Sequence, residues 1–154
     1  MPAIMAVNRV KVFMIIRKLL FVFIALSAFG CGKDDDDVYD LIPNVFVREQ
    51  INVMDLRYPD LRNDNGFAYI PGGVKGIIVF RQNSATYLAF ERNCPFQPYD
   101  SCATVHMDPS KFFFADLCCG SQFNLSGQPI GGPARFSLKK YSTSLSGNTL
   151  TINN

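Results

Sequence analysis

The stretch Asp116–Ala134 reads DLCCGSQFNLSGQPIGGPA, and it is the part of the sequence that says most about the fold. Two adjacent cysteines, Cys118 and Cys119, run into Gly-Ser-Gln-Phe and then into a glycine-rich turn, an arrangement typical of a metal or redox centre. The whole chain has five cysteines but a single histidine, His106. The question is therefore which chemistry the cysteines can supply when the usual nitrogen ligands are missing.

Short β-type runs, separated by turn residues, make up the chain from Val45 onward, and no long segment has helical periodicity. The run Ile77–Phe80 is apolar on both faces, which predicts a central strand. Asp108–Ser110, with the sequence Asp-Pro-Ser, predicts a hairpin turn. We therefore expect one all-β domain, a small antiparallel barrel or stacked sheets. The predicted strands lie at residues 45–53, 67–70, 74–80, 85–92, 103–107 and 111–115, with two more within 137–152.

The first 30 residues have the properties of a secretory signal, with four basic residues and no acidic one. The apolar run Leu19–Gly30 is too short to span ~30 Å of hydrocarbon at ~1.5 Å per residue. The residues before Cys31, Leu-Ser-Ala-Phe-Gly, resemble the lipobox of bacterial lipoproteins, in which this cysteine is acylated and becomes the new N-terminus. The resemblance implies a signal peptide at residues 1–30 and a lipid anchor on Cys31, which would tether the protein to a membrane without spanning it.

An acidic tether is expected at residues 31–44, before a β domain at residues 45–154. Its four consecutive aspartates, Asp34–Asp37, repel one another and favour an extended, solvated leash. A second interpretation is that Lys33 followed by acids resembles the signal that sends some Gram-negative lipoproteins to the outer face of the outer membrane. Both interpretations predict a lipid-anchored protein of the cell envelope, and the second places it at the outer membrane, exposed at the cell surface.

Charge and motifs argue against several classes of function. Without residues 1–30, which hold four of the 15 basic and none of the 13 acidic residues, the net charge is −2. This argues against nucleic acid as a partner, since phosphate binding needs a clustered basic surface. A hydrolase would need a histidine base, and His106 is more simply a surface or packed residue. With no helix-borne metal motif and no glycine-rich phosphate loop, the sequence favours a non-enzymatic protein with no catalytic residue.

Apart from Cys31, four cysteines remain: Cys94, Cys102, Cys118 and Cys119. An even number in an exported protein predicts disulfide bonds. Four cysteines allow three pairings, and the one that joins the neighbours 118 and 119 would need a strained eight-membered ring. Spacing alone leaves the other two pairings open.

The stretch Asp116–Ala134 is similar to the second cluster-binding loop of Rieske iron–sulfur proteins. That loop has the pattern Cys-Pro-Cys-His-Gly-Ser-x-Phe/Tyr-Asp, then a turn containing glycine, then Gly-Pro-Ala. Residues 93–102, NCPFQPYDSC, resemble an expanded form of the first loop, Cys-Thr-His-Leu-Gly-Cys. Leu138, Tyr141 and the final hairpin fit the end of that domain, so the resemblance covers residues 45–152. It implies a Rieske-like fold of antiparallel sheets or a small barrel, with two loops at the cluster site.

Three of the four cluster-ligand positions differ in residue type from the family. Cys94 matches the first cysteine ligand, whereas Phe96 falls at the first histidine, Asp116 at the second cysteine and Cys119 at the second histidine. Phenylalanine cannot ligate iron, and a carboxylate is a hard ligand poorly suited to a sulfide-rich centre. The resemblance therefore implies a scaffold that has lost its two-iron two-sulfur cluster, with no cofactor and no metal expected.

The resemblance also suggests how the cysteines pair. In disulfide-bearing Rieske proteins a bridge joins the two loops through the non-ligand cysteines, which correspond to Cys102 and Cys118. Cys94 and Cys119 are left at ligand positions that face one another, and a second bridge between them would close the cluster site. Each bridge is expected to contribute ~3 kcal/mol to stability.

These observations favour a membrane-anchored module without metal that binds another envelope protein or stabilises an envelope complex. One alternative is a Rieske-type electron-transfer protein, an oxidoreductase whose cluster is held by Cys94, Asp116 and Cys119 with His106 recruited from outside. Another is a thiol–disulfide redox protein that uses Cys118 and Cys119. Against the last, no cysteine lies in a C-x-x-C motif at a helix start, where a thiol pKa is lowered.

Overall fold

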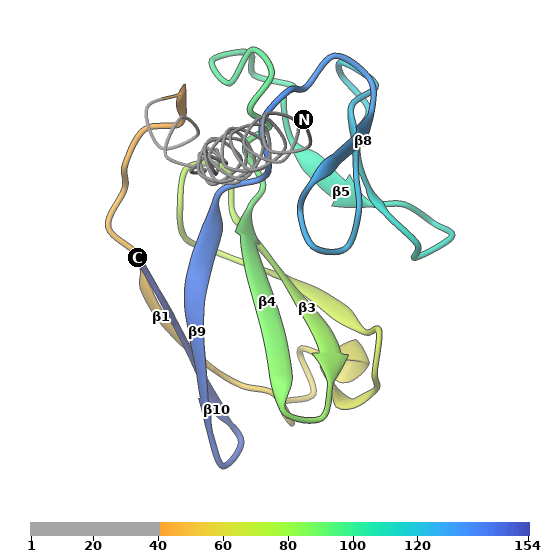
Figure 1. Cartoon of the computed structure of the whole chain (residues 1–154). Helices are drawn as coiled ribbons and strands as arrows, with labels where there is room; N and C mark the ends of the chain where they lie inside the picture. The colour runs from red at the N-terminus through yellow and green to blue at the C-terminus, as the bar shows by residue number, and fades with distance from the viewer. Residues whose placement is uncertain (1–40) are drawn as a thin grey trace, which may run out of the picture. The chain divides into compact units, whose positions relative to one another are not determined.

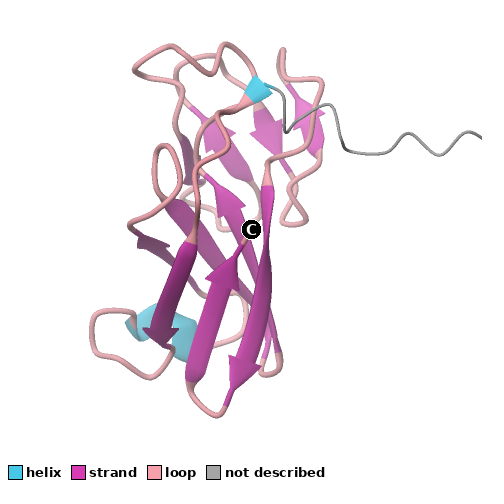
Figure 2. Ribbon diagram, turned by 90° about the vertical axis from the view of Figure 1, so that its left-hand side faces the viewer, coloured by secondary structure: helices cyan, strands magenta, loops and turns pink. Residues whose placement is uncertain are grey.

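The structure is a computed structural model that describes residues 41–154; the predicted signal peptide and residues 31–40 of the predicted tether lie outside the described residues. The described part is all-β apart from a short 3₁₀ helix, as the sequence predicts (Figures 1 and 2). It contains no helix long and apolar enough to cross a membrane. The elements in chain order are β1 Arg48–Asn52, η1 Pro59–Arg62, β2 Phe67–Ile70, β3 Ile77–Asn83, β4 Thr86–Glu91, β5 Val105–Met107, β6 Phe114–Asp116, β7 Gln122–Phe123, β8 Pro129–Gly131, β9 Lys140–Ser146 and β10 Thr149–Asn153.

Two antiparallel sheets make up the domain. The larger has six strands in the order β1-β10-β9-β4-β3-β2, and the smaller has four in the order β5-β6-β7-β8. In Figure 1 the long strands β3, β4, β9 and β10 run together, while β5 and β8 of the small sheet lie at one end of them. The chain enters the small sheet after β4 and returns to the large sheet at β9, so the small sheet is an insertion between two neighbouring strands.

Strand β3 is buried on both faces, which confirms the prediction of a central strand: it pairs with β2 on one side and β4 on the other. Because side chains alternate along a strand, Ile77 and Val79 belong to one apolar cluster, and Ile78 and Phe80 to another. The first cluster lies within the six-stranded sheet and η1. The second joins that sheet to the small sheet, and it includes Phe90, Val105, Met107, Phe114 and Phe123.

The hairpin after β5 is longer than the sequence suggests. The turn predicted at Asp108 is present, where the Asp108 amide donates to the Phe113 carbonyl at 3.0 Å and the Lys111 amide donates to the Asp108 carbonyl at 2.8 Å. Lys111 has a φ of 62° and Phe112 is 79% exposed, so the predicted strand at 111–115 is wrong at its start and begins only at Phe114. Strands β7 and β8 were not predicted, and β1 begins at Arg48, three residues later than expected.

A buried carboxylate fixes the glycine-rich turn before β3. Glu91, the last residue of β4, accepts hydrogen bonds from the amides of Val74 (2.7 Å) and Lys75 (2.9 Å), from the Asn93 amide (2.9 Å) and from the Tyr141 hydroxyl (2.8 Å). Burial, together with the bond to this carboxylate, raises the pKa of Tyr141 well above its usual range. The Lys75 ammonium in turn donates to the carbonyls of Asp100 and Ala103 in the loop after β4. Glu91 therefore fixes the turn directly, and through Lys75 it also holds the loop after β4.

Candidate functional site

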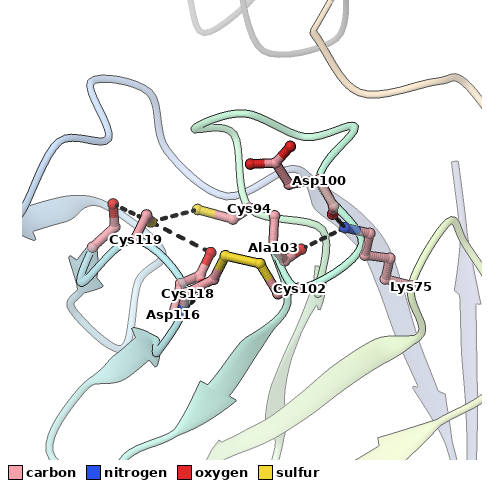
Figure 3. The surroundings of a disulfide bond; sticks show 9 residues. Lys75, Cys94, Asp100, Cys102, Ala103, Asp116, Cys118 and Cys119 are labelled. Carbon is pink, nitrogen blue, oxygen red and sulfur yellow. Dashed lines mark hydrogen bonds between the residues drawn. A yellow bond between two sulfur atoms is a disulfide. The ribbon is translucent and has the colours of Figure 1, made fainter.

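Two loops meet beside the small sheet, one after β4 and one after β6, and a disulfide joins them (Figure 3). It links Cys102 to Cys118, with the two Cα atoms 5.6 Å apart. Both cysteines are exposed at the surface. The structure thus confirms this bridge, which the resemblance to Rieske proteins implies.

Cys94 and Cys119 lie next to the bridge as free thiols. Their Sγ atoms are 3.9 Å apart, and in Figure 3 the two side chains point toward one another. Cys94 is fully buried, whereas Cys119 is partly exposed. The predicted second bridge is therefore not formed in this structure, although the two residues face each other as expected; it stays a prediction for an oxidised form.

A buried carboxylate faces this pair of thiols. Asp116, the last residue of β6, accepts the Cys118 amide at Oδ1 (2.8 Å), which leaves Oδ2 3.4 Å from the Cys119 sulfur. Ser121, also buried, has its Oγ 3.0 Å from the same sulfur and accepts the Ala134 amide at 3.1 Å. Sequence reasoning missed both contacts with Cys119, because they depend on a turn that folds back on itself.

The backbone explains why glycines are needed in this turn. The Gly120 amide donates to the Asp116 carbonyl (2.8 Å) and the Asp116 amide to the Ser121 carbonyl (2.9 Å). Gly132 has a φ of 80°, and a Cβ there would lie 2.5 Å from the Gly120 carbonyl oxygen. The close approach of the Gly131–Gly132 turn thus brings Ala134 within reach of Ser121.

Burial dominates the electrostatics of the site. It raises the pKa of the Cys94 thiol well above its usual range; a backbone hydrogen bond at Phe96 opposes the increase, and Asp116 adds to it. At neutral pH Cys94 is therefore a protonated thiol and a poor nucleophile. The alternative of a thiol–disulfide redox protein pairs Cys118 with Cys119, whereas the structure joins Cys118 to Cys102.

The two remaining positions of interest, Phe96 and His106, do not place a ligand atom at the thiols. Phe96 is partly buried and packs against the second apolar cluster. His106 is in β5 between the buried Val105 and Met107, so it faces the opposite side of the strand, where its Nδ1 is 3.0 Å from Nη2 of Arg92. Burial and the charge of Arg92 lower the pKa of His106.

The structure thus brings together three of the four residues at ligand positions. Within residues 41–154, Cys94, Asp116 and Cys119 form the group of histidine, cysteine and acidic side chains that could hold a metal ion, with their ligand atoms within 4.8 Å of one another. His106 is not part of this group, so its recruitment as a ligand is not supported. A Rieske cluster needs two thiolates on one iron and two imidazoles on the other. This donor set has no imidazole and one donor too few, so the residues do not fit that cluster.

Comparisons with known proteins do not assign this chain to a family. No family model matches the chain, and no curated protein matches it in sequence. Among solved structures, the chain is similar to the cyanobacterial plasma membrane Rieske protein PetC3 from Synechocystis PCC 6803, with 24% identity, 56% of this chain and 84% of that chain covered, and a TM-score of 0.47. The likeness assigns neither a family nor a role to this chain. The described residues form an all-β domain in which a disulfide joins two loops.

Proposed function

We propose that this chain is a lipid-anchored protein of the cell envelope whose Rieske-like domain holds no two-iron two-sulfur cluster and acts as a structural or binding module. The observation that supports this most is the donor set at the former ligand positions. Phe96 offers no ligand atom, Asp116 offers a hard oxygen, and His106 faces away. Electron transfer through such a cluster therefore lacks the ligands it requires.

Other interactions hold the two loops where a cluster would hold them in the family. The Cys102–Cys118 bridge joins them covalently, and Lys75 ties the first loop to the turn before β3. In an oxidised form, the second bridge between Cys94 and Cys119 would add a further link. Loops fixed in this way give a binding surface a defined shape and lower the conformational cost of binding.

The surface of these loops supports a protein partner. Each loop presents a large apolar side chain, Tyr99 at 83% exposure and Leu117 at 86%. The first loop also forms one wall of a groove, which is lined by Pro95, Phe96 and Phe136, among others. Exposed apolar groups beside a groove are typical of protein interaction sites. We therefore propose another envelope protein as the partner, with the membrane reached through the N-terminal lipid and the protein located at the outer membrane.

The absence of the cluster is tested by an iron and acid-labile sulfide assay with a visible spectrum. The full chain is purified in mild detergent under anaerobic conditions, beside a Rieske protein with intact ligands as the control. We expect no stoichiometric iron or sulfide and no visible absorption bands, whereas the control shows all three. Iron and sulfide bound in equal amounts would overturn the proposed function and make this an electron-transfer protein.

The lipid anchor is tested by replacing Cys31 with alanine. Because acylation at this sulfur is the proposed attachment, we expect the C31A variant to lose incorporation of a labelled fatty acid and to leave the membrane fraction. The variant C119A, which removes a cysteine of the domain, should keep both. Labelling that persists in C31A would contradict the anchor.

A further inference from the structure

Of the three donor atoms beside the disulfide, two pairs are already spaced as the ligands of one tetrahedral ion. Zinc binds cysteine sulfur at about 2.3 Å and carboxylate oxygen at about 2.1 Å, so tetrahedral angles separate two sulfurs by about 3.8 Å and a sulfur from an oxygen by about 3.6 Å. Here the sulfurs of Cys94 and Cys119 are 3.9 Å apart, and the Cys119 sulfur is 3.4 Å from Oδ2 of Asp116. These two separations suit a tetrahedral ion to within a few tenths of an ångström, and the ligand atoms of Cys94 and Asp116, which lie within 4.8 Å of each other, would complete the group by moving toward the ion.

We propose that Cys94, Asp116 and Cys119 bind a single zinc-type divalent cation. This site goes beyond the proposed function, which excludes only the two-iron two-sulfur cluster. Two thiolates and a carboxylate are ordinary ligands of zinc, although they are a poor set for that cluster. A single ion also needs no imidazole, so the position of His106 does not count against it.

The neighbours of the three ligands hold them in place. The Cys118 amide fixes one carboxylate oxygen of Asp116 and leaves the other aimed at Cys119. The Ser121 hydroxyl lies beside the Cys119 sulfur and is itself fixed by the Ala134 amide. Hydrogen-bonded partners of this kind orient metal ligands and strengthen binding. The Cys102–Cys118 bridge adds a covalent limit on the separation of the two loops.

The fourth coordination position faces the open side of the site. Cys119 is partly exposed, and a Cβ placed on Gly120 would meet no atom within 4 Å. A water molecule can therefore complete the tetrahedron, as in zinc sites with three protein ligands. The same two sulfurs cannot bind zinc and be joined in a disulfide, so the second bridge is the competing state of this site.

The test is a metal titration of the full chain in detergent under anaerobic conditions. A thiol count after denaturation establishes that Cys94 and Cys119 are free, and a protein without free thiols is first reduced. Co²⁺ is then added, followed by Zn²⁺. We expect one Co²⁺ per chain, with sulfur-to-cobalt charge-transfer absorption and visible bands of tetrahedral intensity, and displacement by Zn²⁺.

Variants identify the ligands. D116N and C119S should each weaken Co²⁺ and Zn²⁺ binding by more than about 100-fold. Replacing a residue that only hydrogen-bonds to a metal ligand typically weakens binding by roughly 10- to 100-fold. The control D100N removes a carboxylate of the first loop that lies outside the three-residue group, and it should bind as the unchanged chain does. Circular dichroism without metal shows whether each variant is folded. Because two ligands are replaced independently, the test still holds if one of the two variants does not fold.

Three outcomes would overturn the inference. The first is that the protein with Cys94 and Cys119 as free thiols binds no Co²⁺, and the second is a cobalt spectrum without thiolate charge transfer. The third is that D116N and C119S bind the metal as tightly as D100N does. None of these results affects the proposed function, which is tested separately by the iron and labile-sulfide assay and by the lipid label on Cys31.

Discussion

Replacing Glu91 with alanine should lower the free energy of unfolding by about 4 kcal/mol, a large part of the total for a domain of this size. The carboxylate is fully buried and accepts four hydrogen bonds, three from backbone amides and one from the Tyr141 hydroxyl. Alanine would leave these donors without an acceptor, and each buried donor left unsatisfied costs about 1–3 kcal/mol, reduced where water can enter. The net loss should therefore exceed that of an ordinary surface substitution several-fold.

Denaturant unfolding, followed by circular dichroism, measures this effect. The matched control is E49A, because Glu49 is a partly exposed strand residue, and its loss should cost no more than about 0.5 kcal/mol. E91Q keeps the shape and one acceptor oxygen, so we expect an intermediate loss. Equal stability of E91A and E49A would show that the turn before β3 does not depend on this acid.

The same substitution should also loosen the site. Glu91 fixes the amide of Lys75, and the Lys75 ammonium holds the Ala103 carbonyl in the first loop. Amide hydrogen exchange in the loop should therefore rise in E91A under conditions where the domain is still folded. The protection of β10, which pairs with β1 and β9, serves as the internal reference.

Much of the sheet structure could be predicted because it depends on local patterns. The apolar run Ile77–Phe80 indicates burial on both faces, and in the structure it belongs to a strand that pairs with another strand on each side. Strands β7 and β8 could not be predicted, because they have two and three residues in a glycine-rich stretch without alternation. Their pairing depends on β6, which places them in the sheet.

The site was predictable as a set of positions but not as a set of contacts. The resemblance to Rieske loops identified Cys94, Asp116 and Cys119 as neighbours, and it identified the Cys102–Cys118 bridge. It could not show that the carboxylate of Asp116 turns toward a thiol, since that contact depends on the Cys118 amide. Glu91 shows the same limit: an acid after an apolar strand gives no sign that three donors from distant segments, besides the nearby Asn93 amide, surround it.

Removing the Cys102–Cys118 bridge should be the other large change in stability. The bridge joins residues 16 positions apart, and closing a loop of about 15 residues contributes about 3 kcal/mol in the chain-entropy account. The double variant C102S/C118S, which leaves no unpaired partner, should therefore melt roughly 10 °C lower than the unchanged chain. C119S keeps the bridge and should melt close to the unchanged chain, so similar values for the two variants would contradict this account.

Reductant separates the two possible bridges. Cys102 and Cys118 are exposed, so reduction should open their bond readily and lower the melting temperature of the unchanged chain as far as the double substitution does. If Cys94 and Cys119 are thiols, reductant should have no further effect on C102S/C118S. A further drop in that variant would mean that Cys94 and Cys119 had closed into a disulfide, because no other pair of cysteines in the domain remains to be reduced. These two sulfurs would then be unable to bind a metal ion until that bond is opened.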